Sequence, residues 1–140
     1  MNENTFQPEK KIVFVVDDVL SNLLIAKDAL KDSYRVITFD SAAKLFAFLL
    51  KIKPDLILLD IEMPKVNGFQ VLKELKEDKA NKDIPVIFVT SEGTAANVSK
   101  AAVSGADDFI VKPYEPDALL EKVESLFAKA SPAGDKTTPS

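Results

Sequence analysis

The sequence predicts an α/β domain in which five parallel strands alternate with five helices, with helices covering both faces of the sheet. Two observations support this fold class. Five short apolar runs, most of them rich in β-branched and aromatic residues, are distributed along the chain. Each is followed by a longer segment in which apolar residues recur at helical spacing. This alternation is typical of a doubly wound parallel sheet built from right-handed crossover units.

Length and composition indicate a single globular domain. The chain has 140 residues, of which 46% are hydrophobic and 29% are charged, and these are ordinary values for a packed domain. We expect the domain to span residues 11–130, between a flexible lead-in at residues 1–10 and a disordered polar tail at residues 131–140.

The composition also excludes several kinds of chemistry. The sequence contains no cysteine and no histidine, which rules out disulfides, thiolate nucleophiles and imidazole acid–base catalysis. Because 22 acidic residues outnumber 18 basic ones, we expect no direct contact with nucleic acid. We find no secretory signal and no apolar segment of membrane-spanning length, so we expect a cytoplasmic protein with no membrane contact.

The first strand is predicted at residues 12–16, and Asp17 and Asp18 follow it directly. Ser21 or Asn22 is expected to cap the helix that comes next. One face of this helix is expected to carry four leucines: Leu20, Leu23, Leu24 and Leu30.

The second and third strands are predicted at residues 35–39 and 55–60. Asp40 or Ser41 is expected to cap the helix between them. Four apolar residues mark the buried face of this helix: Ala42, Leu45, Phe46 and Leu49. The third strand is apolar until Asp60 ends it, which is typical of a strand buried on both faces.

The third helix follows a loop at residues 64–68, and three residues mark its buried face: Phe69, Leu72 and Leu75. Residues 84–89 form the fourth predicted strand, which ends at Thr90. The fourth helix is weaker because its apolar residues are small: Ala95, Val98 and Ala102. Gly105 is expected to close it as a left-handed C-cap.

The fifth strand is predicted at residues 108–111 and ends at Lys112 and Pro113. The last helix begins near Glu115, and five apolar residues line one of its faces: Leu119, Leu120, Val123, Leu126 and Phe127.

The polar residues at the strand ends indicate a site. In a flavodoxin-like strand order of 2-1-3-4-5, the first and third strands are neighbours at the switch point of the sheet, so Asp17, Asp18 and Asp60 would meet there. Three adjacent carboxylates repel one another unless a cation lies among them, and hard oxygen ligands favour Mg²⁺. Thr90 and Lys112 end the next two strands. A carboxylate nucleophile, a metal ion, a hydroxyl and an ammonium together favour phosphoryl transfer to Asp60.

Dispersed motifs strengthen this interpretation, because they resemble the receiver domain of two-component response regulators. The motifs are Val16-Asp17-Asp18, Asp60-Ile61-Glu62-Met63-Pro64, Asn67-Gly68, Thr90, Gly105-Ala106-Asp107-Asp108-Phe109 and Lys112-Pro113. The resemblance extends over about residues 11–129. It implies a cytoplasmic signalling switch that accepts a phosphoryl group from a sensor histidine kinase or a histidine phosphotransfer protein, as in a phosphorelay. It does not imply a turnover enzyme, beyond self-catalysed phosphoryl transfer and autodephosphorylation.

The resemblance also implies the roles of the acidic residues. Asp60 would be the phospho-acceptor. Asp18 would bind Mg²⁺ or Mn²⁺ directly, and Asp17 would bind it directly or through water. Asp60 and the backbone carbonyl of Glu62 would be the remaining protein ligands of the metal ion.

The remaining motif residues resemble the switching elements of the family. Lys112 would contact the phosphoryl group, and its peptide bond to Pro113 would be cis. Thr90 and Phe109 occupy the family's switch positions. The surface formed by the fourth helix, the fifth strand and the last helix would then control a downstream effector, or a second copy of the chain in a phosphorylation-dependent homodimer.

A few positions depart from the family's commonest residues or vary within it. Ser91 stands where the family often has alanine, whereas Asn22 matches many receivers of hybrid kinases. Glu62 and Glu92 occupy positions that vary in the family and affect how long the phosphoryl group persists. The sequence leaves open whether the receiver is a stand-alone regulator or part of a longer protein.

Three alternative functions fit these residues less well. A phosphatase of the haloacid-dehalogenase type needs a second carboxylate two residues after the nucleophile on its first strand, whereas Glu62 follows the third. An FMN-binding protein needs a phosphate loop after the first strand, where Asp17 and Asp18 would repel phosphate. A degenerate receiver used only for docking is disfavoured because the acidic residues, Thr90 and Lys112 are all present.

Overall fold

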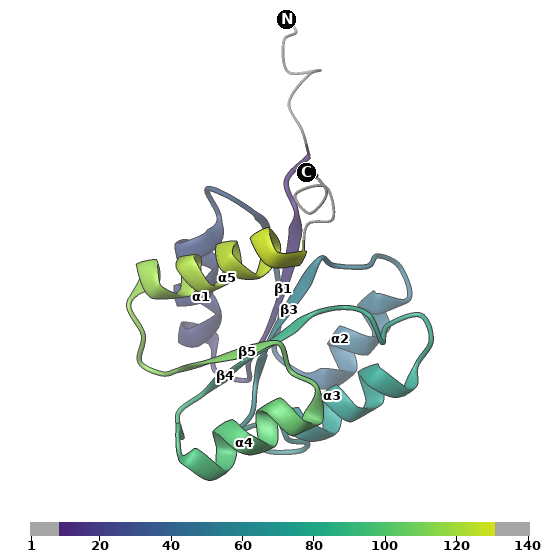
Figure 1. Ribbon diagram of the computed structural model, residues 1–140. Helices are drawn as coiled ribbons and strands as arrows, with labels where there is room; N and C mark the ends of the chain where they lie inside the picture. Colours follow the sequence, from purple (N-terminus) through teal and green to yellow (C-terminus); the bar gives the residue numbers. More distant parts are fainter. Residues whose placement is uncertain (1–8, 131–140) are drawn as a thin grey trace, which may run out of the picture.

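A parallel sheet of five strands forms the centre of the molecule, with helices on both faces (Figure 1). The computed structural model describes residues 9–130, so the tail and almost all of the lead-in lie outside the described residues. The strand order is β2-β1-β3-β4-β5, and all four pairings are parallel. The predicted fold class and strand order are therefore confirmed.

The elements alternate along the chain as the sequence pattern predicts. The strands are β1 (Ile12–Val16), β2 (Arg35–Phe39), β3 (Leu56–Asp60), β4 (Val86–Thr90) and β5 (Asp108–Val111). The helices are α1 (Leu20–Leu30), α2 (Ala42–Leu49), α3 (Gly68–Glu77), α4 (Ala95–Ser104) and α5 (Pro116–Ala130).

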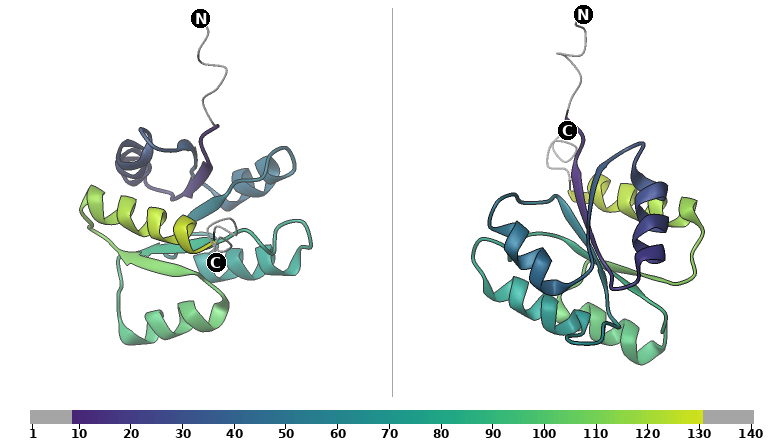
Figure 2. Two further views of the ribbon diagram at one scale, coloured as in Figure 1. Left: turned by 45° about the horizontal axis from the view of Figure 1, so that its top comes forward. Right: turned by 180° about the vertical axis from the view of Figure 1, so that it is seen from behind.

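Successive residues of the central strands enter two separate cores. Phe14 and Val16 of β1 belong to the core on the side of α2, α3 and α4, whereas Val13 and Val15 belong to the core under α1 and α5. Figure 2 shows the two groups of helices on opposite faces of the sheet. All five residues of β3 and of β4 are buried, which explains why both strands read as continuous apolar runs.

Helix α1 faces the sheet differently from the prediction. Its buried residues are Leu23, Ala26 and Leu30, whereas Leu20 is 67% exposed and Leu24 is 56% exposed. The prediction was wrong for these two leucines because the small side chain of Ala26 lies on the buried stripe. That stripe follows i, i+3 and i+7 spacing, which turns Leu24 toward solvent.

Two of the predicted helix caps are confirmed, and one is wrong. Ser41 caps α2, and its hydroxyl accepts a hydrogen bond from the Lys44 N–H at 3.2 Å. Ser21 and Asn22 do not cap α1, because both lie inside the helix and its N-cap residue is Val19. Gly105 closes α4 in the predicted left-handed conformation, with φ of 97°.

Helix α4 packs only lightly on the sheet. Its buried residue is Ala101, and Val98 is half-buried. Ala95 and Ala102, which were expected on the packed face, are exposed. Helix α4 therefore depends on few apolar contacts, as the small residues of its sequence indicate.

Candidate functional site

The predicted site residues meet at the carboxyl edge of the sheet. Asp17 follows β1, Asp60 ends β3, and Thr90 ends β4; all three are at most 3% exposed. Asp18 is exposed beside them, and Lys112 follows β5. Carboxylate oxygens of Asp17, Asp18 and Asp60 all lie within 4.8 Å of one another. Parallel strands bring these residues together because their carboxyl ends all lie at one edge of the sheet.

Asp60 is a buried carboxyl group beside other negative charges. It is 2% exposed, and β3 holds it opposite Val89 of β4. Burial raises its pKa to about 6, and the neighbouring Asp17 adds to the increase, whereas Lys112 opposes it. Asp60 is therefore ionised at neutral pH, and Lys112 offsets its negative charge only in part.

Lys112 is the cation of the site. Its Nζ lies 3.2 Å from Asp17 Oδ2 and 3.3 Å from Asp60 Oδ1. Burial acts against the charged form of Lys112, but Asp60 and Asp17 outweigh it and raise the lysine pKa. Lys112 therefore stays protonated, and it can neutralise oxygens that come close to Asp60. Its peptide bond to Pro113 is cis.

Local contacts orient Asp17 for this role. Its Oδ1 accepts a hydrogen bond from the Val19 N–H at 2.9 Å and a longer one from Asn22 Nδ2 at 3.4 Å. Asp17 therefore stabilises the start of α1 in place of a capping side chain. Burial and the Asp17 charge together raise the pKa of the nearby Tyr114 phenol to about 12.

The donor set fits a divalent metal ion. Three carboxylates and one ammonium leave a net charge of about −2 among hard oxygen ligands, which suits Mg²⁺ or Mn²⁺. Asp18 is exposed, so water has access to complete a coordination shell.

Thr90 lies at the same edge, but its hydroxyl contacts a different carboxylate. Thr90 Oγ1 donates a hydrogen bond to Glu62 Oε2 at 2.6 Å and accepts one from the Glu92 N–H at 2.9 Å. The Ser91 N–H donates to Glu62 Oε1 at 3.1 Å. The family resemblance implies that the Glu62 carbonyl binds metal and that this position affects phosphoryl lifetime. It does not predict these side-chain contacts, since no sequence pattern links residues 28 positions apart.

The loop between β3 and α3 passes very close to Asp60. The Gly68 N–H donates to the Ile61 carbonyl at 2.8 Å, and a Cβ on Gly68 would lie 2.5 Å from the Asp60 carbonyl oxygen. Asn67 caps α3 through a reciprocal hydrogen-bonded pair with Gln70. The Asn67-Gly68 motif therefore allows α3 to begin directly behind the site.

Phe109 is half-buried in β5 and packs against the core on the side of α2, α3 and α4. The Lys122 ammonium lies 6.0 Å from the centre of its ring. Phe109 is thus in β5, the strand next to the one that carries Thr90.

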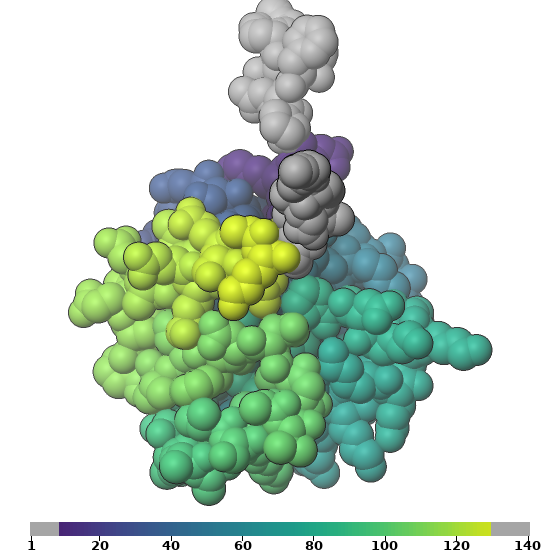
Figure 3. All heavy atoms as spheres, viewed as in Figure 1, coloured from purple at the N-terminus to yellow at the C-terminus, as the bar shows by residue number. Residues whose placement is uncertain are grey.

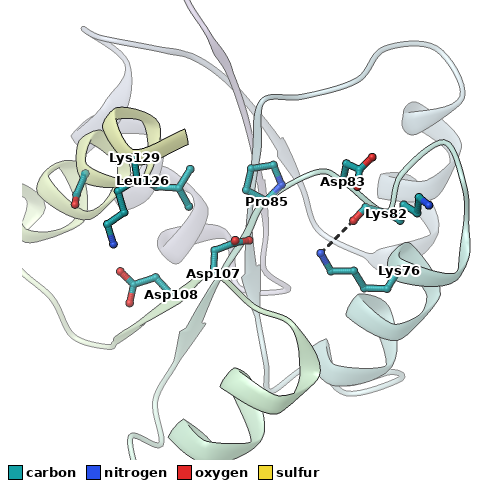
Figure 4. A pocket seen from close by; sticks show the side chains of 9 residues that line it. Lys76, Lys82, Asp83, Pro85, Asp107, Asp108, Leu126 and Lys129 are labelled. Atoms are coloured by element: carbon teal, nitrogen blue, oxygen red, sulfur yellow. Dashed lines mark hydrogen bonds between the residues drawn. The ribbon is translucent and has the colours of Figure 1, made fainter. Parts of the chain in front are cut away.

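Two cavities differ in their relation to the site. One of about 370 Å³ adjoins it, and its lining residues are Asn22, Ile25, Ser91, Lys112, Pro113 and Tyr114. Another of about 430 Å³ lies near the start of β4 and β5 (Figure 4). It is at the opposite end of those strands from Thr90 and Lys112. Three of its charged groups are bonded within the protein: Lys76 Nζ donates to the Lys82 carbonyl, Asp107 accepts from the Val86 N–H, and Asp108 pairs with Lys122. We therefore place the chemistry at the carboxyl edge.

Among residues 9–130, every helix is too short or too polar to cross a membrane.

Comparisons with known proteins agree with this geometry. The family model described as "Response regulator receiver domain" matches residues 13–124. The chain is 32% identical over 130 residues to the phosphate regulon transcriptional regulatory protein PhoB of Pseudomonas aeruginosa, covering 93% of this chain and 56% of PhoB. It is 32% identical over 124 residues to the two-component response regulator ORR3 of Oryza sativa, covering 88% of this chain and 95% of ORR3. The chain spans only about half the length of the transcriptional regulators that it matches.

Solved structures give the same result. The chemotaxis protein CheY4 of Vibrio cholerae superposes with a TM-score of 0.78 at 27% identity, covering 83% of this chain and 98% of CheY4. The Mn²⁺-bound form of response regulator Rcp1 superposes with a TM-score of 0.70 at 25% identity, covering 84% of this chain and 92% of Rcp1. Fold, family model and relatives agree, and the chain belongs to the response regulator receiver domains of two-component systems.

Proposed function

We propose that this receiver is a phosphorylation-controlled switch in which Asp60 accepts a phosphoryl group from a sensor histidine kinase or a histidine phosphotransfer protein. The observation that carries the proposal is the buried Asp60 carboxylate with the Lys112 ammonium 3.3 Å away. An Asp60 oxygen attacks phosphorus, a P–O bond forms, and the P–N bond to the donor imidazole breaks. Lys112 then neutralises charge on the transferred oxygens.

The acidic cluster would hold the metal ion for this reaction. Asp17, Asp18, Asp60 and the backbone carbonyl of Glu62 are the proposed ligands. A bound Mg²⁺ or Mn²⁺ would offset the charge of the three carboxylates and of the incoming phosphoryl oxygens. The oxygen donor set and the Mn²⁺-bound form of the similar Rcp1 support this assignment.

The proposed output is a change in the surface formed by α4, β5 and α5. In Figure 3, α4 and α5 lie on the same face of the molecule, in green and yellow-green. A phosphoryl group at Asp60 would attract the Thr90 hydroxyl and the Lys112 ammonium, which end β4 and precede α5. Phe109 would move with them. Helix α4 buries few side chains, so a small change in interaction free energy would be enough to change its position.

The proposed partner of that surface is a downstream effector protein or domain, or a second copy of the chain. Several relatives are named as transcriptional regulators, and one of them is named as DNA-binding. This chain covers about half of those proteins, and its net charge is −4. We therefore propose that the effector, and not this chain, makes any contact with nucleic acid.

Incubation with a small phosphodonor and Mg²⁺, followed by intact-mass measurement, tests the proposal. We expect one phosphoryl adduct on the wild-type chain and on Glu74→Gln, which changes one exposed carboxylate of α3. We expect none on Asp60→Asn, because an amide is a far weaker nucleophile than a carboxylate. Continuous release of phosphate without an adduct would instead indicate a phosphatase, and an adduct on Asp60→Asn would remove Asp60 as the acceptor.

A further inference from the structure

The carboxylate of Glu62 receives three hydrogen bonds from two consecutive residues at the end of β4. Thr90 Oγ1 donates to Oε2 at 2.6 Å, and the Ser91 N–H and Ser91 Oγ donate to Oε1 at 3.1 and 3.3 Å. We call this set the Glu62 contact. Hydrogen bonds to an ionised acceptor are stronger than neutral ones, and Thr90 is only 1% exposed. The Glu62 contact is therefore a defined feature of this site.

The contact uses the only proton that the Thr90 hydroxyl can donate. A hydroxyl has one O–H donor, while its lone pairs accept, and here Thr90 Oγ1 already accepts the Glu92 N–H at 2.9 Å. Thr90 can therefore donate to Glu62 or to an oxygen of a phosphoryl group on Asp60, but not to both. The two anions compete for one donor.

We infer that Glu62 is a positioning residue that holds the Thr90 hydroxyl in the unphosphorylated arrangement, so that a phosphoryl group on Asp60 must displace it. This inference rests on the proposed function, because it assumes that Asp60 is the acceptor and that Thr90 responds. Ser91 joins the contact through its hydroxyl as well as its backbone N–H. Glu62 and Ser91 together would thus favour the unswitched state.

Removal of the Glu62 contact should make the switched state easier to reach. Glu62→Ala leaves the buried Thr90 hydroxyl with the more distant Glu92 carbonyl, at 3.4 Å, as its acceptor until an anion arrives at Asp60. We expect the Glu62→Ala chain to bind an anion at Asp60 about five- to thirty-fold more tightly than the wild type does. Glu62→Gln keeps one acceptor oxygen, so its anion affinity should lie between those of the wild type and Glu62→Ala. Ser91→Ala removes one of three donors and should have a smaller effect in the same direction.

Beryllofluoride is a suitable probe, since a solved receiver similar to this chain is described as BeF3-activated. Its affinity in the presence of Mg²⁺ can be measured from amide resonances for the wild type and each variant. Glu74→Gln removes the same charge from an exposed position on α3 and should match the wild type. Glu62→Ala should also speed amide hydrogen exchange at residues 91–94 before any probe is added.

A double-mutant cycle with Thr90→Val separates the hydroxyl from simple charge repulsion. Valine keeps the shape of the buried side chain but donates no proton, so the effect of Glu62→Ala should fall below about two-fold in this background. An equal effect with and without the hydroxyl would overturn the inference, as would unchanged or weaker binding by Glu62→Ala. If the wild type itself does not bind beryllofluoride at Asp60, the proposed function fails instead.

Discussion

The ammonium group of Lys112 lies 3.3 Å from Asp60 Oδ1, although β5 and β3 are not neighbours in the sheet. The strand between them is β4, which ends in Thr90. The long lysine side chain therefore links the proposed phospho-acceptor directly to the segment that leads into α5. We therefore expect a change of charge at Asp60 to act on β5 directly, without passing through the backbone of β4.

Lys112→Ala should lower the stability of the metal-free protein. The substitution leaves Asp17 and Asp60 buried without their cation, and we expect a loss of about 1–3 kcal/mol in urea unfolding with chelator present. The matched control is Lys122→Ala, which removes a more exposed ion pair with Asp108 and should cost less than about 1 kcal/mol. Equal losses in the two variants would contradict this account of Lys112.

The same variant should separate phosphorylation from switching. Asp60 keeps its nucleophilic oxygen in Lys112→Ala, so an adduct should still form in the presence of Mg²⁺ and a small phosphodonor. Without the lysine, β5 loses its direct contact with the phosphoryl group, and amide exchange around Phe109 should respond less than in the wild type. A full response would show that the coupling takes another route.

The stability of the metal-free protein should depend on the protonation of Asp60. Its folded pKa of about 6 lies above the unfolded value of about 4, so the folded state binds a proton more tightly. Asp60 therefore favours folding at low pH, and this contribution is lost as pH rises through about 6. A difference of about two pKa units corresponds to about 3 kcal/mol as an upper figure.

Urea unfolding of the wild type and Asp60→Asn at pH 5 and pH 7.5, with chelator, measures this effect. Asn has no charge to desolvate, so Asp60→Asn should be the more stable protein at pH 7.5, and its advantage should shrink at pH 5. A stability difference that does not vary with pH would show that Asp60 does not titrate in this range.

Asp18→Asn should weaken Mg²⁺ binding and slow phosphorylation. The substitution removes one charged ligand from the acidic cluster, and it also removes a like-charge repulsion, so the metal-free protein should become more stable. Calorimetry with Mg²⁺ and thermal unfolding with chelator check the two effects. Asp28→Asn, on the exposed side of α1, should leave Mg²⁺ affinity unchanged. Unchanged affinity in Asp18→Asn would remove Asp18 from the metal site.

Thr90→Ala should leave phosphorylation of Asp60 largely intact and reduce the response of α4 and β5. The hydroxyl is the group of β4 that a phosphoryl oxygen would attract, whereas the reacting carboxylate belongs to β3. Hydrogen exchange with and without phosphodonor is the measurement, and wild-type changes should reach residues 95–110. Changes confined to the loops around Asp17, Asp60 and Lys112 would contradict the proposed route to the output surface.

Much of the fold and part of the site follow from local sequence. Strands β3 and β4 are recognisable because a strand buried on both faces is apolar along most of its length, here as far as Asp60 and Thr90. The meeting of Asp17 with Asp60 follows from parallel strand direction and strand order, since carboxyl ends share one edge of the sheet. Gly105 and Ser41 were predictable as caps because their conformational and hydrogen-bonding preferences are local.

The tertiary structure alone decided the rotation of α1 and the partner of Thr90. Leu20 and Leu24 have the same apolar side chain as Leu23, so only packing against the sheet determines which of them is buried. Thr90 has carboxylates of both Asp60 and Glu62 near the end of its strand, and the loop after β3 brings the Glu62 carboxylate to its hydroxyl. These contacts join residues far apart in sequence, where no local preference operates. Their geometry depends on how loops and side chains pack once the sheet has formed.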